Sequence, residues 1–149
     1  VTLFRIVNNI NNWRPLVKSI KNLRYKIEKG KLISAIGFAP YVSLKIKRVV
    51  KKACHPDPTK RFQSAQEMRQ SLEKLIPSIC WKLHTNGSWI GICCKTGVQY
   101  ETRILKKRTG IDVNITKNNR RNRNECKHFK DEDDAFKYMY SYISETSFS

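Results

Sequence analysis

The spacing of apolar residues along the chain changes near Pro77. Before this proline, apolar residues recur every three or four positions, which is the period of an amphipathic helix. After it, short runs rich in Trp, Ile, Cys, Val and Tyr are separated by Gly and Asn, a pattern that favours strands and turns. The sequence therefore predicts an α+β protein in two parts, a helical segment over residues 1–77 and a small ββββα module over residues 78–149.

Two of the predicted helices lie on either side of a proline-rich corner. The first begins at Ser43, a suitable N-cap, and the second at Ser64, which Glu67 follows in the S-x-x-E pattern of a capping box. Between them, Pro56 and Pro58 stop the first helix and force the chain to turn. The apolar stripes are Ile46, Val49, Val50, Ala53 and Cys54 in the first helix and Ala65, Met68, Leu72, Leu75 and Ile76 in the second.

An earlier helix is predicted over residues 16–29. The Asn-rich segment 8–15 before it is typical of a loop, and Pro15 suits the first helical turn. Gly30, just past the end of this helix, suits a left-handed C-cap.

The second part of the chain predicts a four-stranded meander followed by a helix. The strands cover residues 79–84, 89–94, 98–105 and 111–115, and Asn86-Gly87 is a strong hairpin signal between the first two. After a basic loop, the acidic run 131–134 opens the final helix, because carboxylates are stabilised at the positive end of the helix dipole. The buried face of this helix is expected to be Ala135, Phe136, Met139, Tyr140 and Ile143.

The corner and its two helices resemble the end of the large lobe of a Ser/Thr protein kinase. The similarity rests on the run A-C-H-P-D-P-T-K-R-F over residues 53–62, in which Asp57, Pro58 and Arg61 form a D-P-x-x-R pattern. In that family such a run joins helices H and I, and the resemblance implies that residues 1–77 correspond to helices F to I. It does not extend to residues 78–149. A helical hairpin from some other domain is the alternative, because a capping box occurs in many folds.

The resemblance also limits the expected chemistry. Phosphoryl transfer by a protein kinase needs a Gly-rich loop, a strand lysine, the aspartate of H-R-D and the aspartate of D-F-G. The sequence contains none of these motifs, which precede helix F in the family. We therefore expect this chain alone to have no catalytic activity and to bind no cofactor, and kinase activity to require an upstream catalytic part.

Arg61 is the residue to which a family role transfers most directly. In kinases its counterpart pairs with the glutamate of an A-P-E motif at the end of the activation segment, and the sequence has no such motif. Because a buried guanidinium without an acceptor is costly, we expect Arg61 to be partly exposed or to bind another acceptor of this chain. A solvated surface arginine is the simpler alternative.

Charge is the second strong feature of the sequence. The 149 residues have a formal net charge of +18. The first 77 residues hold 17 Lys and Arg against 4 acids, and the remaining residues hold 13 against 8. Such a balance predicts an acidic partner: nucleic acid, an anionic membrane surface or an acidic protein. The resemblance adds an upstream kinase lobe as an expected partner, and lipid binding is the lesser option because the apolar sides of the helices are needed for packing.

The basic residues form clusters that could contact anions. One cluster lies in the Asn-rich loop of the second part, and the others lie on the predicted helices of the first; the candidates are Lys117, Arg120, Arg121, Arg123, Lys21, Arg24, Lys51 and Lys52. No base-reading motif or aromatic platform accompanies them, so solvated basic faces are the alternative.

The five cysteines, an odd number, indicate a reducing compartment and suit small core positions. Cys80, His84, Cys126 and His128 offer metal-ligand atoms, but no C-x-x-C pair or familiar spacing joins them, so no metal site is expected. The sequence also has no membrane-spanning apolar run and no signal-peptide pattern, and it predicts a cytoplasmic location.

Three functions follow from these observations. The leading one is a non-catalytic C-terminal segment of a kinase-like protein that serves in docking and regulation. The second is a free-standing basic module that binds nucleic acid. The third is a kinase remnant that occupies a docking partner as a decoy.

Overall fold

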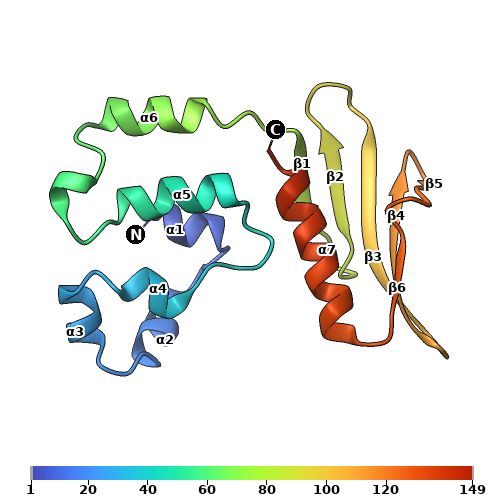
Figure 1. Ribbon diagram of the computed structural model, residues 1–149, viewed down its shortest axis with the longest axis horizontal. Coiled ribbons are helices and arrows are strands. Elements are labelled where there is room, and N and C mark those ends of the chain that lie inside the picture. Colours follow the sequence, from blue (N-terminus) through green and yellow to red (C-terminus); the bar gives the residue numbers. More distant parts are fainter. Residues whose placement is uncertain (1, 149) are drawn as a thin grey trace. The chain divides into compact units, whose positions relative to one another are not determined.

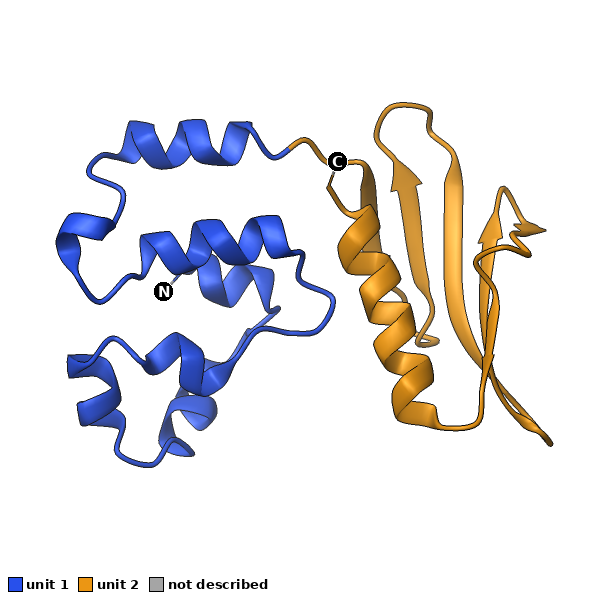
Figure 2. Ribbon diagram, in the orientation of Figure 1, with its two compact units in different colours: residues 1–75 blue, residues 76–149 orange. Residues whose placement is uncertain are grey.

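The computed structural model describes residues 2–148, and the chain forms two compact units, residues 1–75 and 76–149 (Figures 1 and 2). The first unit is helical, and the second is an antiparallel sheet with one long helix. This composition is the α+β class expected from the sequence. The division falls close to Pro77, where the hydrophobic pattern changes.

Unit 1 contains short helices around a small core. Phe4 is fully buried and meets the rings of Trp13 and Phe38 edge-on, at centroid distances of 6.3 and 5.2 Å. Val49 and Val50, on the longest helix in this unit, are also buried in this core. The elements are α1 (Thr2–Val7), α2 (Trp13–Lys18), α3 (Leu23–Glu28), α4 (Leu32–Ile36), α5 (Leu44–Ala53), the 3-10 turn η1 (Pro58–Lys60) and α6 (Ala65–Glu73).

The two predicted caps are confirmed. The Ser43 hydroxyl accepts a hydrogen bond from the Ile46 amide at 3.4 Å, and the Ser64 hydroxyl accepts one from the Glu67 amide at 3.0 Å. The Glu67 carboxylate completes the capping box one residue further back than the usual pattern, because it accepts from the amide of Gln63 at 2.8 Å. Helices α5 and α6 therefore begin where the sequence indicates, on either side of the corner.

The prediction of one helix over residues 16–29 is wrong. The segment forms two short helices, α2 and α3, separated by residues 19–22. Ser19 ends α2 and its hydroxyl donates to the Leu16 carbonyl at 2.7 Å, while Asn22 precedes α3 with a left-handed φ of 56°. A hydroxyl that bonds the preceding turn competes with helix continuation, and asparagine tolerates the left-handed conformation.

Unit 2 is a six-stranded antiparallel sheet with a helix on one face (Figure 1). Strands follow the order β1-β2-β3-β4-β5. Strand β6 also pairs with β4, at residues 111–113, whereas β5 pairs with residues 116–117. Val113 and Ile115 of β4 are fully buried, and Ala135, Met139 and Ile143 of the helix are at most 1% exposed. The elements are β1 (Ile79–Leu83), β2 (Trp89–Cys93), β3 (Gln99–Lys107), β4 (Gly110–Lys117), β5 (Arg120–Arg121), β6 (Lys127–Phe129) and α7 (Glu132–Thr146).

The expected meander is present, but the count of four strands is wrong for the described residues. The segment expected as a basic loop contains β5 and β6. Asn118 and Asn119 both have positive φ, 49° and 60°, and make a tight turn in which Lys117 is paired directly with Arg120. Two consecutive left-handed residues are the requirement of a two-residue hairpin turn, and asparagine meets it.

Candidate functional site beside Arg61

The corner between α5 and α6 is held by its own side chains. The Asp57 carboxylate accepts hydrogen bonds from the Thr59 amide at 3.0 Å and the Thr59 hydroxyl at 2.7 Å, and so caps η1. These two bonds, the hydroxyl first, lower the pKa of Asp57. The Asp57 amide in turn donates to Nδ1 of His55 at 3.1 Å. These hydrogen bonds, together with the two prolines, fix the conformation of the turn that precedes Arg61.

Arg61 is exposed and bonded to the backbone of the corner, as predicted. Its Nε donates to the His55 carbonyl at 2.6 Å and its Nη2 to the Pro56 carbonyl at 3.0 Å. Among residues 2–148 it makes no ion pair with an acid. Two carbonyls therefore fix the orientation of the guanidinium, and its remaining N–H groups can donate hydrogen bonds to another acceptor.

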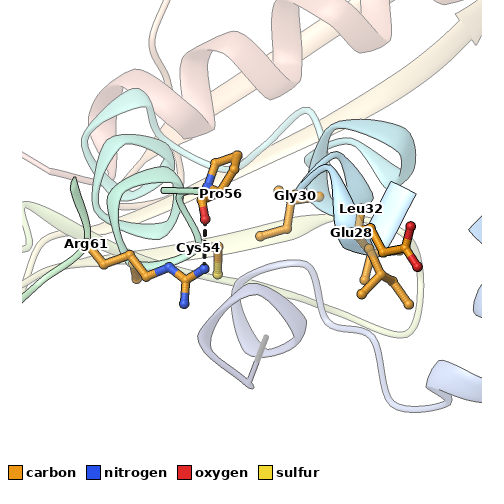
Figure 3. Close-up of a pocket in the computed structure, with 9 residues that line it drawn as sticks. Glu28, Gly30, Leu32, Cys54, Pro56 and Arg61 are labelled. Atoms are coloured by element: carbon orange, nitrogen blue, oxygen red, sulfur yellow. Dashed lines mark hydrogen bonds between the residues drawn. The ribbon is translucent and has the colours of Figure 1, made fainter. Parts of the chain in front are cut away.

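A pocket of about 320 Å³ lies beside this guanidinium (Figure 3). Its walls come from α3, α4, the end of α5 and the corner, and most of the side chains are apolar. The lining residues are Ile27, Glu28, Gly30, Leu32, Ile33, Ala53, Cys54, Pro56 and Arg61. A hollow with several apolar side chains in its walls and one oriented cation at its edge suits a short segment with an apolar side chain and an anionic group.

Glu28 is the acidic residue of this lining, but it does not neutralise Arg61. Its carboxylate accepts from Nε of Arg24 at 3.0 Å, one helical turn earlier on the same helix. Figure 3 shows this carboxylate directed away from the Arg61 guanidinium, on the far side of Gly30. Glu28 therefore does not pair with Arg61.

Gly30 permits the close approach that forms the pocket. It has a positive φ of 61°, as its predicted C-cap role requires, and a Cβ added there would lie 2.5 Å from Cβ of Pro56. Only glycine allows the end of α3 to touch the corner in this way. Sequence reasoning anticipated the left-handed cap but not the contact with Pro56, because nothing local in the sequence relates two segments 26 positions apart.

The candidate anion-binding residues of unit 1 do not form one site. Arg24 is paired with Glu28, and Nζ of Lys52 lies 2.6 Å from a carboxylate oxygen of Glu67 and 4.6 Å from the centroid of the Phe62 ring. Lys21 lies between α2 and α3, and Lys51 is exposed in the last turn of α5. Two of the four cations are thus occupied within the chain.

The candidates of unit 2 lie closer together. Lys117 ends β4 and faces Arg120 across the Asn118–Asn119 turn, while Arg121 is paired with Thr116. Arg123 follows in the connection to β6. The structure thus brings Lys117 and Arg120 together on a hairpin instead of the irregular loop that the sequence indicated.

The cysteine and histidine residues considered as metal ligands are dispersed. Within residues 2–148, no three His, Cys, Asp or Glu side chains are grouped as a metal site would need. Sγ of Cys80 instead lies 3.0 Å from Sγ of Cys94, a pair that sequence reasoning missed. His128 contacts Asp112, its direct partner in the β4–β6 ladder.

Comparisons with known proteins give no neighbour: no protein-family model, curated protein or solved structure matches the chain. None of the helices in the described part of the chain combines the length and apolar character needed to cross a bilayer.

Proposed function

We propose that residues 1–77 are a docking segment related to the C-terminal helices of a Ser/Thr protein kinase lobe, and that the pocket beside Arg61 receives an acidic segment. The segment would come from an upstream kinase lobe or from an acidic partner protein. Its role is binding and regulation, and the proposed role uses no catalytic group of this chain. The odd number of cysteines supports placing this role in the reducing cytoplasm.

The observation that supports the proposal is the arrangement of Arg61. Two backbone carbonyls orient its guanidinium at the edge of a pocket that several apolar side chains line, and the acid of this lining, Glu28, is paired with Arg24. A guanidinium held in this way is ready to donate charge-assisted hydrogen bonds to a carboxylate, which are stronger than bonds between neutral groups. The resemblance supplies the expected ligand, a glutamate that follows Ala-Pro.

Binding of two matched peptides tests this proposal. A short fluorescein-labelled peptide containing Ala-Pro-Glu, and a second in which Gln replaces the Glu, are titrated with the full chain while anisotropy is recorded. The glutamate peptide is expected to bind about tenfold more tightly, the effect of one charge-assisted interaction. Equal affinity for the two peptides would show that Arg61 does not select a carboxylate.

Three variants locate the interaction. Arg61→Gln is expected to remove the preference for the glutamate peptide, and Arg61→Lys to restore it in part, because lysine keeps the charge but lacks the planar fork. Arg69→Gln is the matched control, since Arg69 is an exposed arginine of α6 paired with Glu73. Circular dichroism of each variant checks that the helices persist, and a preference that survives Arg61→Gln in a folded protein contradicts the proposal.

A further inference from the structure

Strand β3 continues past the end of its neighbour β2 (Figure 1). The last pair between β2 and β3 is Trp89 with Thr102, whereas β3 stays paired with β4 as far as Lys107. The last five residues of β3, from Arg103 to Lys107, therefore have a neighbouring strand on one side only, and they are here called the free edge. At the usual rise per residue, the free edge is roughly 17 Å long.

The free edge carries backbone groups that no strand uses. In an antiparallel ladder, alternate residues bond to the same neighbour. The Gln99 carbonyl accepts from the amide of Asn118, on the β4 side, so odd-numbered residues of β3 bond toward β4 and even-numbered residues face away from it. Among residues 2–148, no partner bonds the N–H and C=O groups of Ile104 and Lys106 on the side away from β4. Such groups are a template for pairing with another chain.

A pocket of about 400 Å³ lies along the free edge. It is lined by residues 86–88, in the turn between β1 and β2, by residues 103–106 of the free edge, and by Glu132 and Phe136 of α7. Because residues 86–88 lead directly into β2, the pocket lies where a strand that continued the line of β2 would run.

Helix α7 also extends beyond the end of β2. Tyr140 meets the ring of Trp89, the first residue of β2, edge-on at a centroid distance of 6.5 Å. Phe136, one helical turn earlier, stacks on Tyr140 and is half-exposed in the pocket beside Ile104. Ile104 is paired directly with the buried Val113, so both side chains project toward α7. Phe136 and Ile104 thus offer apolar surface to one side chain of an added strand.

The free edge is strongly basic. The segment R-I-L-K-K-R over residues 103–108 holds four cations. Lys106 and Lys107 are paired with acids of this chain, whereas Arg103 and Arg108 form no ion pair within residues 2–148. The same edge of a second copy would bring like charges opposite one another, which destabilises a ladder. An acidic strand is the occupant that complements these charges.

We propose that the free edge binds an extended acidic segment of a partner protein as an added strand. Side chains along such a strand alternate between the two sides of the sheet. A residue paired with Ile104 points toward α7, so an apolar side chain fits there against Phe136. Its neighbours point to the other side, where Arg103 lies, so carboxylates fit there. The ligand is therefore a short segment in which apolar and acidic residues alternate. This site uses residues of unit 2 and is independent of the pocket beside Arg61.

Two peptides test the charge and the pattern. A fluorescein-labelled peptide in which Glu and Val alternate is titrated with the full chain while anisotropy is recorded. A second peptide, with Lys in place of each Glu, is expected to bind roughly tenfold more weakly because it brings like charges to the edge. Failure of the Glu–Val peptide to bind, or equal affinity for the two peptides, overturns the proposal.

Methylation of the peptide backbone tests the mode of binding. Only every second N–H of an added strand faces the sheet. N-methylation of either the valines or the glutamates is therefore expected to weaken binding roughly tenfold, and N-methylation of the other set should weaken it by less than about twofold. Equal effects of the two sets would show that the peptide is held by charge alone and would overturn the added strand.

Variants of Lys106 test the same pairing from the protein side. Lys106→Pro removes an N–H that faces away from β4, a position at which an edge strand tolerates proline. Lys106→Ala is the matched control, because it removes the same side chain and its ion pair with Glu132 but keeps the N–H. The proline variant is expected to bind the Glu–Val peptide several-fold more weakly than the alanine variant. Equal binding by the two variants, with the sheet intact by circular dichroism, contradicts the proposal.

An arginine pair and amide exchange locate the site without a proline. Arg103→Gln is expected to weaken the Glu–Val peptide about threefold, whereas Arg120→Gln, at an exposed arginine of β5, should have little effect. Saturating peptide is also expected to slow hydrogen exchange at the amides of Ile104 and Lys106, measured by NMR. Equal effects of the two arginine variants, or unchanged exchange at both amides, would place the peptide elsewhere and overturn the assignment to the free edge.

Discussion

Nδ1 of His128 lies 2.7 Å from Oδ1 of Asp112, and the two residues are direct partners across β4 and β6. The other carboxylate oxygen of Asp112 pairs with Nζ of Lys107, at the end of β3. Asp112 is only 8% exposed, so this carboxylate joins three strands from a nearly buried position. The hydrogen bond from Lys107, and then that from His128, lower the pKa of Asp112.

This lowered pKa predicts acid-dependent stability. A carboxyl whose pKa is lower in the folded than in the unfolded state stabilises the fold at pH values above its unfolded pKa, about 3.9, and this stabilisation is lost as the pH falls through the folded pKa. Asp112→Asn is expected to cost about 1 kcal/mol in urea unfolding at neutral pH. The cost should shrink below about pH 4. Glu101→Gln, on β3, is the control, and a cost that does not change with pH contradicts the explanation.

Unlike the paired carboxylate of Asp112, the buried hydroxyl of Thr102 has no hydrogen-bond partner among the described residues. Its side chain is fully buried between β2 and β4, opposite Trp89 and Ile115, and its hydroxyl finds no hydrogen-bond partner among the described residues. Because valine has nearly the same shape, Thr102→Val is expected to raise the free energy of unfolding by about 1 kcal/mol. Thr116→Val, at a half-buried position of β4, should change it by less. A destabilised Thr102→Val protein would indicate an unseen partner of the hydroxyl.

Gly91 is required by the packing of its neighbours. A Cβ at this position of β2 would lie 2.6 Å from Cγ2 of Ile79 and 2.7 Å from the Trp81 ring, both on the paired strand β1. Gly91→Ala is therefore expected to destabilise unit 2 by about 1–3 kcal/mol, the usual cost of overpacking. Urea unfolding of the original protein and of the variant, followed by tryptophan fluorescence, measures the change in the free energy of unfolding. Ile79→Ala removes the Cγ2 atom, so in a double-mutant cycle Gly91→Ala should cost less in the Ile79→Ala background than in the original protein. An equal cost in both backgrounds would place the strain elsewhere.

Local signals in the sequence were sufficient for much of the fold. The caps at Ser43 and Ser64, the hairpin at Asn86-Gly87 and the acidic start of α7 at Asp131 each depend on neighbouring residues, and each is present in the structure. Such signals act within a few positions, so a sequence exposes them directly. The expected buried face of α7 was only partly right, because Phe136 and Tyr140 remain half-exposed.

Other features of the fold were missed, either because a local break interrupts a regular pattern or because the feature depends on tertiary structure. The break at Ser19 to Asn22 defeats a helical pattern that continues through it, and β5 and β6 are too short, at two and three residues, to show a strand period. The contact of Gly30 with Pro56 and the thiol pair Cys80–Cys94 arise from tertiary structure. For the candidate site, the sequence identified Arg61 and its need for a new acceptor, but not the pocket beside it.

The capping box at α6 makes a further prediction about the corner. The Ser64 hydroxyl accepts from the Glu67 amide, and the Glu67 carboxylate joins the Gln63 amide to Lys52 of α5. Ser64→Ala is expected to cost about 1 kcal/mol, and Ser64→Asp, which keeps an acceptor, should cost much less. Thermal unfolding followed by circular dichroism at the helical band measures both. If alanine and aspartate have equal effects, the cap does not contribute to stability.

The Cys80–Cys94 pair predicts a specific oxidation product. Both thiols are exposed, and their sulfurs lie 3.0 Å apart between β1 and the turn after β2. With hydrogen peroxide as oxidant, the two thiols lose two protons and two electrons to form one disulfide, and the peroxide is reduced to two waters. We expect peptide mapping by mass spectrometry to find this crosslink ahead of any crosslink through the adjacent Cys93.

The pH dependence distinguishes this pair from the neighbouring thiol. The hydrogen bond with Cys94, then burial, raise the pKa of Cys80, whereas the Thr96 hydroxyl and the backbone amides of the turn lower that of Cys93. Because the thiolate is the reactive form, disulfide formation should continue to accelerate above about pH 8.5, the ordinary thiol pKa. Cys80→Ser should abolish the crosslink and Cys93→Ser should leave it intact. A crosslink that persists in Cys80→Ser would show that Cys93 reaches Cys94 or another thiol instead.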